Sequence, residues 1–197
     1  MKAWMVVAAI AAAAGIGAGY LAAAPTRGHG RALPGVTVSA DGRSIAASGG
    51  TGDVLTAEET ATTVRLQLRT GFAWLPIAGT GIIAVAHLRA PLGARRLIDA
   101  TRPDHTAVVR LPTYLPAGFA PVGTRVDFDR DRCELIFATP GGVVLTVVEE
   151  PVTAGDLPPG AWRVIRDGRT YTVVPRSYGY DRIDPADPAR VGASIGS

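Results

Sequence analysis

The sequence predicts a mainly β protein, with an antiparallel meander or small sheet domain behind an N-terminal transmembrane helix. Two observations lead to this prediction. Residues 3–24 contain no charged side chain, and residues 107–174 consist of short apolar runs separated by turns rich in Pro, Gly and Asp. The segments we expect along the chain are a membrane anchor or signal segment (1–24), a flexible juxtamembrane linker (25–60), a β-rich domain (61–175) and an extended tail (176–197).

The N-terminal apolar segment is long enough to stay in a membrane. A spanning helix needs about 20 apolar residues, whereas the core of a cleaved signal has about 7–15. Trp4 and Tyr20 would lie roughly 24 Å apart along a helix, close to the spacing of two interfacial aromatic belts. Ala22 and Ala24 match an A-x-A cleavage site, but Pro25 fits poorly after a cut. We therefore predict a retained anchor, with a cleaved signal as the alternative.

The charges that flank this segment do not select its orientation. Lys2 precedes it, while Arg27 and Arg31 follow it. A two-residue leader is typical of a secretory-type segment, whose start stays in the cytoplasm. We expect a single-pass protein of the cell membrane with its bulk extracytoplasmic, or a secreted protein if the segment is cleaved. The opposite orientation is the alternative on charge grounds.

The next part of the chain changes from a linker composition to a strand pattern. Residues 25–60 are rich in Gly, Ser, Ala and Arg, which predicts a flexible linker with a short strand at 36–39. A clearer strand signal follows, because Val64, Leu66 and Leu68 alternate with polar residues. This alternation predicts one buried and one solvated face.

Residues 71–88 carry no charge apart from one histidine, and two structures fit them. We expect a hairpin, with residues 72–75 ending one strand and residues 82–88 forming the returning strand. The alternative is a second membrane span. It is weaker because the stretch is at the lower length limit and Pro76 and two glycines interrupt it.

The clearest domain signal is the series of short apolar runs between residues 107 and 174. Pro, Gly and Asp turns separate them, which predicts an antiparallel meander. The strands expected before the last hairpin are Val108–Leu111, Pro121–Phe128, Cys133–Thr139 and Val143–Glu149.

The last hairpin supplies the candidate contact site. If Asp167 and Gly168 form a two-residue turn, Arg166 faces Arg169. Like charges that face each other mildly destabilise a hairpin unless solvent or an anion separates them. We therefore take Arg166 and Arg169 as a possible contact for an anion or an acidic partner. The residues expected to share one face of this hairpin are Trp162, Val164, Tyr171 and Val173.

The carboxylates that most resemble a metal site do not complete one. Asp127, Asp129 and Asp131 alternate as in the opening of a calcium loop, but Arg132 and Ala138 stand where that loop needs Gly and Glu. The three histidines are far apart in the sequence. We expect no metal, no cofactor and a charged hairpin turn at the aspartates.

No catalytic residue is predicted either. Cys133 shares strand parity with Leu135 and Phe137, which indicates a buried thiol, and as the only cysteine it excludes an intrachain disulfide. Asp104 and His105 are expected in a loop next to Pro103. The net charge of +3 is spread along the chain without a basic block, so we expect no nucleic-acid partner.

Several short motifs resemble a known domain. They are Leu111 to Phe119 (LPTYLPAGF), Leu135 to Phe137 (LIF), Val143 to Glu149 (VVLTVVE) and Arg166 to Tyr171 (RDGRTY). Residues 107–174 thereby resemble a small β-rich domain of unknown function found in extracytoplasmic parts of bacterial anti-sigma factors and lipoproteins. The resemblance implies an extracytoplasmic, non-catalytic β domain. Anti-sigma activity is not carried over, because no lipid-bearing cysteine and no anti-sigma helical region accompany the motifs.

Taken together, these patterns predict a membrane-tethered, extracytoplasmic domain that binds or senses and does not catalyse. The expected partners are the membrane, through residues 3–24, and an envelope protein or anionic envelope component. One alternative is a two-span accessory subunit of a membrane complex with residues 71–88 as the second span. Another is a secreted hydrolase whose cleft would combine Asp99, Asp104 or His105 with Tyr178 or Asp181.

Overall fold

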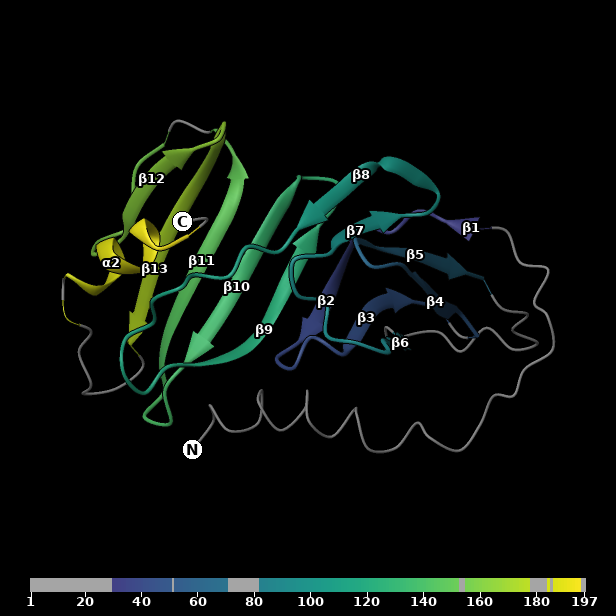
Figure 1. Ribbon diagram of the computed structural model, residues 1–197, viewed down its shortest axis with the longest axis horizontal. Coiled ribbons are helices and arrows are strands. Elements are labelled where there is room, and N and C mark those ends of the chain that lie inside the picture. Colours follow the sequence, from purple (N-terminus) through teal and green to yellow (C-terminus); the bar gives the residue numbers. More distant parts are fainter. Residues whose placement is uncertain are drawn as a thin grey trace.

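Two β-sheets and a short helix make up the described part of the protein, so the prediction of a mainly β chain is confirmed. The predicted anchor lies outside this part, and no helix within it has the length and apolar character to cross a membrane. Figure 1 shows the two sheets side by side along the long axis of the molecule. The computed structural model describes residues 30–50, 52–70, 82–152, 155–177, 184 and 186–195.

The larger sheet has eight strands, and every neighbouring pair in it is antiparallel. The predicted strand at residues 36–39 is confirmed as part of it. In spatial order its strands are β12 (Trp162–Arg166), β13 (Arg169–Ser177), β11 (Val143–Pro151), β10 (Arg132–Ala138), β9 (Ala120–Asp127), β2 (Gly35–Ser39), β3 (Ser44–Gly49) and β6 (Ile82–His87).

The smaller sheet has five strands around a central β5. Val64, Leu66 and Leu68 of β5 are fully buried, as their alternation predicts. β4 and β7 pair with opposite edges of β5, and the β5 and β7 pair is parallel. The strands are β1 (Gly30–Arg31), β4 (Val54–Glu59), β5 (Thr63–Arg69), β7 (Arg96–Asp99) and β8 (Arg102–Val108).

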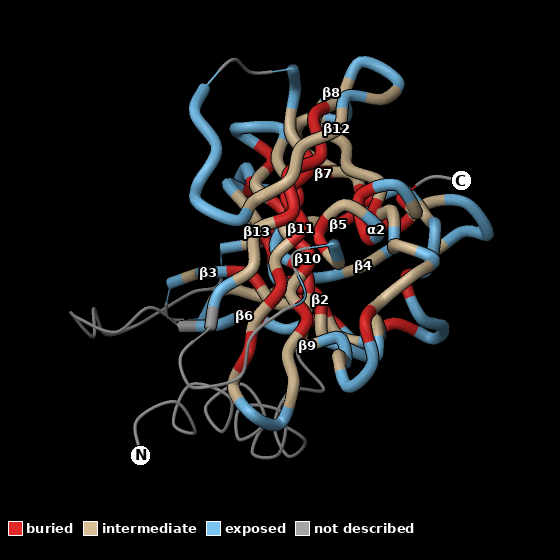
Figure 2. Tube along the Cα trace, turned by 90° about the vertical axis from the view of Figure 1, so that its left-hand side faces the viewer, coloured by how far each residue is buried: buried red, intermediate tan, exposed pale blue. Residues whose placement is uncertain are grey.

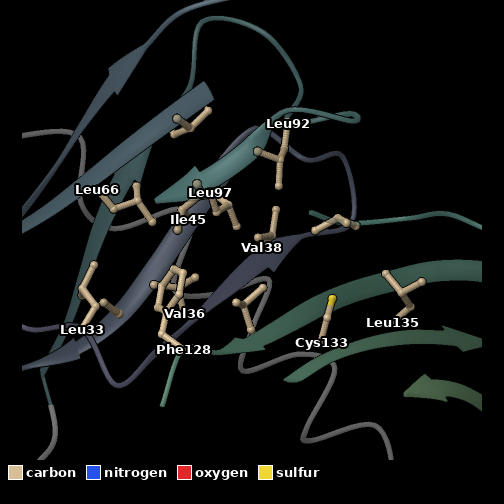
Figure 3. Packing of buried hydrophobic residues seen from close by; sticks show 14 of the residues in the cluster. Leu33, Val36, Val38, Ile45, Leu66, Leu92, Leu97, Phe128, Cys133 and Leu135 are labelled. Carbon is tan, nitrogen blue, oxygen red and sulfur yellow. The ribbon is translucent and has the colours of Figure 1, made fainter. Parts of the chain in front are cut away.

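One hydrophobic core joins the two sheets. The smaller sheet covers the inner face of β2, β3 and β6, and Figure 3 shows Leu66 and Leu97 directed toward Val36, Val38 and Ile45. The other half of the larger sheet is covered by the segment 109–119 and by helix α2 (Asp187–Ala193). Figure 2 shows buried residues along the middle of the molecule, between these layers.

The linker predicted for residues 25–60 is largely sheet. β1, β2, β3 and the whole of β4 lie in it, and the described sheet structure therefore begins at Gly30. The sequence pattern understated these strands because their inward residues include alanines, which carry little hydrophobic signal. Ile45 and Ala47 of β3 are nevertheless 0% and 3% exposed. Residues 25–29 of the predicted linker lie outside the described part.

The C-terminal tail is not extended as predicted, because β13 continues to Ser177 and residues 187–193 form α2. Val191 and, beyond the helix, Ile195 are 0% and 1% exposed, so two apolar side chains suffice to dock the tail. Trp162 lies against the helix at Gly192, where an added Cβ would stand 2.0 Å from Cζ3 of the indole ring. The close approach requires glycine at this position.

The predicted meander is correct except at its last step. β9, β10 and β11 follow one another as expected, and the final hairpin has the predicted register, with Trp162 opposite Val173 and Arg166 opposite Arg169. However, β13 and not β12 adjoins β11. β12 is placed at the sheet edge, where it pairs with β13 alone. The prediction of a strand at residues 108–111 is wrong, because only Val108 lies in a strand, as the last residue of β8.

Residues 82–87 form the returning strand that the hairpin prediction placed there. This strand, β6, pairs with β3 from Ile82 opposite Gly49 to His87 opposite Ser44. It makes no pair with β5. The strand end at residues 72–75, its predicted partner in the hairpin, cannot be compared. This half of the alternative membrane span is a strand of the sheet, and residues 71–81 lie outside the described part.

Candidate binding groove

A groove of about 530 Å³ lies on the outer face of the larger sheet, where β9, β2 and β3 run side by side. The strand pairings place Arg125, Thr37, Ala46 and Val85 in one row of directly opposed residues across four strands. Thr37 and Ala46 are small and form the floor together with Ser48. The groove exists because the outward positions of β2 and β3 have no large side chain.

One side of the groove is apolar. Ile83 and Val85 point outward from the edge strand β6 and are 57% and 39% exposed. Ile83 stands opposite Ser48, and Val85 opposite Ala46, so both rise above smaller neighbours. Of the two, Ile83 lines the groove itself, and Val85 lies beside it on the same strand.

The other side of the groove is charged, and its carboxylates are compensated. Arg130 lies 3.3 Å from the carboxylate of Asp127, and Arg102 donates from Nη1 to the carboxylate of Asp129 at 2.5 Å. Arg125, by contrast, is exposed, and its side chain has no hydrogen bond or ion pair with the described residues. Glu134 stands opposite Arg125 on the neighbouring strand β10, but it is paired with Arg132 at 2.8 Å.

The predicted contact arginines face each other at the hairpin tip but are held by other parts of the chain. The Arg166 guanidinium donates to the carbonyl oxygen of Ile195. Arg169 donates to the Asp131 carboxylate, and its Nε lies 3.2 Å from Oε1 of Glu149. An anion or acidic partner at these two residues stays a prediction, and these contacts add no support to it.

A cluster of hydrogen-bonded polar side chains, partly buried, lies behind this hairpin. Arg110 donates to Glu149 at 2.7 Å and to the Tyr171 hydroxyl at 2.9 Å. Burial, with Glu149 adding to it, raises the pKa of Tyr171, although Arg110 opposes this. Burial also raises the pKa of the nearby Cys133 thiol to about 12. The thiol is 3% exposed, which confirms the predicted buried cysteine.

Three of the residues named for the alternative hydrolase, Asp99, Asp104 and His105, are among the described residues. Asp99 is fully buried and saturated with hydrogen bonds. Asp104 and His105 lie in β8 and not in a loop, and the Asp104 side chain is 83% exposed. Tyr178 and Asp181, the partners this alternative requires, lie outside the described residues. Neither the groove nor the smaller pocket is lined by the three described residues.

A second, smaller pocket of about 190 Å³ lies on the inner side of the larger sheet. Its lining is mostly apolar and includes Val38, Leu92, Val109, Leu115 and Phe137. Ser39 and Thr124 add hydroxyl groups, and none of its lining residues is titratable. Within the described ranges, no three His, Cys, Asp or Glu side chains are grouped to hold a metal ion.

Sequence reasoning missed the groove and Arg125. The available signal was the run of small residues at alternate positions of the segment 35–48, which composition led us to interpret as a linker. The pairing of β2 with β9 joins residues that are far apart in the sequence, such as Thr37 and Arg125. Local patterns contain no information on such a pairing.

The fold defines the class only as a two-sheet, mainly β protein with an open groove on the outer face of its larger sheet, lined by two arginines and two aspartates. No protein-family model matches the chain, and comparisons with curated proteins and with solved structures give no match either. The resemblance of residues 107–174 to an extracytoplasmic β domain therefore stays a prediction.

Proposed function

We propose that this chain is a membrane-tethered, extracytoplasmic, non-catalytic binding domain whose groove takes up a partner-protein segment with apolar and acidic side chains. The observation that carries the proposal is the row across the groove. It sets the unpaired Arg125 on one side, the exposed Val85 on the other, and the small Thr37 and Ala46 between them.

The dimensions of this row suit a protein segment. Neighbouring strands lie about 4.8 Å apart, so the backbones of β9 and β6 are separated by roughly 14 Å. An α-helix with its side chains is about 10–12 Å wide, and an extended strand is narrower. A segment lying along the floor would thus reach Arg125 with an acidic side chain and Ile83 or Val85 with an apolar one.

The tether is supported by the sequence of residues 3–24, which has the length and the aromatic spacing of a membrane span. The non-catalytic character is supported by the state of the reactive groups. Cys133 has a buried thiol with a raised pKa, and Asp99 is enclosed by hydrogen-bond donors. Both the Cys133 thiol and the Asp99 carboxylate are buried in the folded protein and do not contact solvent.

A displayed library of random peptides, panned on the full chain in lipid nanodiscs, tests the groove. Enriched peptides are expected to combine acidic and apolar residues, and the Arg125→Glu substitution is expected to weaken their binding at least tenfold. A charge reversal at an interface sets like charges against each other, which costs more than about 1.4 kcal/mol, a factor of ten.

Arg176→Glu is the matched control. Arg176 is also exposed, it lies on β13 of the same sheet, and three strand spacings separate β13 from β9. Peptide binding that survives Arg125→Glu but not Arg176→Glu would place the binding surface elsewhere. Enrichment of basic peptides would contradict the charge argument itself.

A further inference from the structure

We infer that the outer face of the smaller sheet rests on anionic lipid headgroups of the membrane that holds residues 3–24, and that the groove consequently faces away from the bilayer. This inference rests on the membrane tether of the proposed function. It adds which surface of the domain contacts the lipid.

The tether is short. Five residues, 25–29, separate the end of the predicted anchor from Gly30, the first residue of β1. From residue 24 to Gly30 there are six residue steps, which span at most about 22 Å even when fully extended. Gly30 must therefore stay within that distance of the membrane, and a domain of two packed sheets cannot tumble freely on so short a connection.

Gly30 enters the fold at the outer face of the smaller sheet. It is paired with Arg69 at the end of β5. A Cβ added to Gly30 would lie 3.0 Å from Nε2 of Gln67. Gln67 alternates with the fully buried Leu66 and Leu68 and so points outward. The tether therefore arrives beside the outward side chains of β5.

Those outward side chains are mainly cationic. On β5 and β7 they include Arg65, Arg69 and Arg96, against two carboxylates, Glu58 opposite Arg65 on β4 and the 83% exposed Asp104 on β8. Arg65 and Arg96 are exposed, and their side chains make no hydrogen bond or ion pair with the described residues. Unpaired arginines near a membrane surface are attracted by anionic lipids within about one Debye length.

The arrangement of the two sheets then fixes the direction of the groove. The smaller sheet packs on the inner face of β2 and β3, while Thr37, Ala46 and Ser48 of the groove lie on their outer face. Packed sheets are about 10 Å apart, so the groove lies on the far side of the sandwich from the tether. A partner segment would approach it from the extracytoplasmic space.

Two exposed threonines allow a direct test of this orientation. Thr56 lies on the outer face of β4, and Thr37 lies in the groove on β2, each in mid-strand. The native Cys133 is 3% exposed and burial raises its thiol pKa to about 12, so a thiol-reactive fluorophore leaves it unlabelled. Thr56→Cys and Thr37→Cys therefore give single, matched labelling sites.

The full chain carrying each label is reconstituted in vesicles of phosphatidylcholine and phosphatidylglycerol that contain a headgroup-linked nitroxide quencher in both leaflets. We expect the Thr56→Cys label to be quenched several-fold more strongly than the Thr37→Cys label. The difference in quenching between the two labels should become smaller in the double variant Arg65→Gln/Arg96→Gln. It should also become smaller at high salt and in vesicles without phosphatidylglycerol, because each of these changes weakens the attraction between the arginines and the lipid headgroups. Arg125→Gln, a charge loss on the groove side, should leave it unchanged.

Equal quenching of the two labels, or stronger quenching of the Thr37→Cys label, would overturn the inference and leave the tether intact. A difference that is insensitive to Arg65→Gln/Arg96→Gln and to phosphatidylglycerol would overturn the role of anionic headgroups. Washing the vesicles with alkaline carbonate separates these results from failure of the proposed function. A chain that is washed off has no membrane span, and both proposals would then fall together.

Discussion

The buried carboxylate of Asp99 connects segments that are distant in the sequence. Asp99 at the end of β7 accepts hydrogen bonds from the Leu33 amide at 3.0 Å, from the Thr101 hydroxyl at 2.7 Å and from Arg102 Nε at 3.0 Å. Arg102 in turn donates to the Leu33 carbonyl oxygen. One carboxylate thereby joins the β1 to β2 connection to the β7 to β8 turn.

Asp99→Asn is expected to destabilise the protein by about 2–4 kcal/mol, because it removes a charge that buried donors and Arg102 require. Denaturation of the full chain with urea, followed by circular dichroism, measures the effect. Asp104→Asn is the control, since its side chain is 83% exposed and the change should cost less than about 0.5 kcal/mol. Equal effects of the two substitutions would contradict the role assigned to Asp99.

The same interactions predict a pH dependence. Burial alone would raise the pKa of Asp99, but the hydrogen bonds from Leu33, Thr101 and Arg102 outweigh it and hold the pKa below its ordinary value. The stability that Asp99 contributes is fully present above the unfolded-state pKa of about 3.9 and is lost as the pH falls through the lower folded-state pKa. The stability difference between the wild type and Asp99→Asn should therefore narrow below about pH 4.

Individual elements differ in how far the sequence predicted them. β5 and the hairpin of β12 and β13 were predictable, because alternation and an Asp-Gly turn are local signals. β3 and β4 were not, because small and polar residues in a Gly-rich stretch resemble a linker. To predict the groove, one would have needed both the missed strand β3 and the long-range pairing of β2 with β9. The charged residues of the groove can be read from the sequence, but the strand pairing that brings them together cannot.

The docking of α2 gives a prediction at this scale. Gly192→Ala should destabilise the protein by about 1–3 kcal/mol, because the new methyl group would lie 2.0 Å from Cζ3 of Trp162. Helix propensity alone would give the opposite sign, a gain of about 1 kcal/mol. Thermal unfolding compares it with Gly155→Ala, whose added Cβ meets no atom within 4 Å. A stabilised Gly192→Ala variant would show that the helix does not pack on Trp162.

The molecule as a whole is held by one continuous core and should unfold in one step. Leu97 in the smaller sheet and Leu145 in the larger sheet are both 0% exposed members of the same cluster. Leu97→Ala and Leu145→Ala should each lower the free energy of unfolding by about 2–5 kcal/mol and shift one shared transition. Coincident curves by circular dichroism and tryptophan fluorescence are expected. Separate transitions, each sensitive to one substitution, would contradict a common core.

The place of β13 between β11 and β12 has a consequence for the order in which the chain is made. β11 pairs with β10 along one edge and with β13 along the other, and β13 is the last strand of the sheet to be synthesised. The second edge of β11 is therefore fully paired only after Ser177 has been synthesised. Until then the nascent protein has an open edge with consecutive unpaired amides, which other chains can use as a template. The β12 to β13 hairpin has a local turn and can form on its own before it closes that edge. A ribosome that stops within β13 would therefore release a chain prone to pairing with its neighbours.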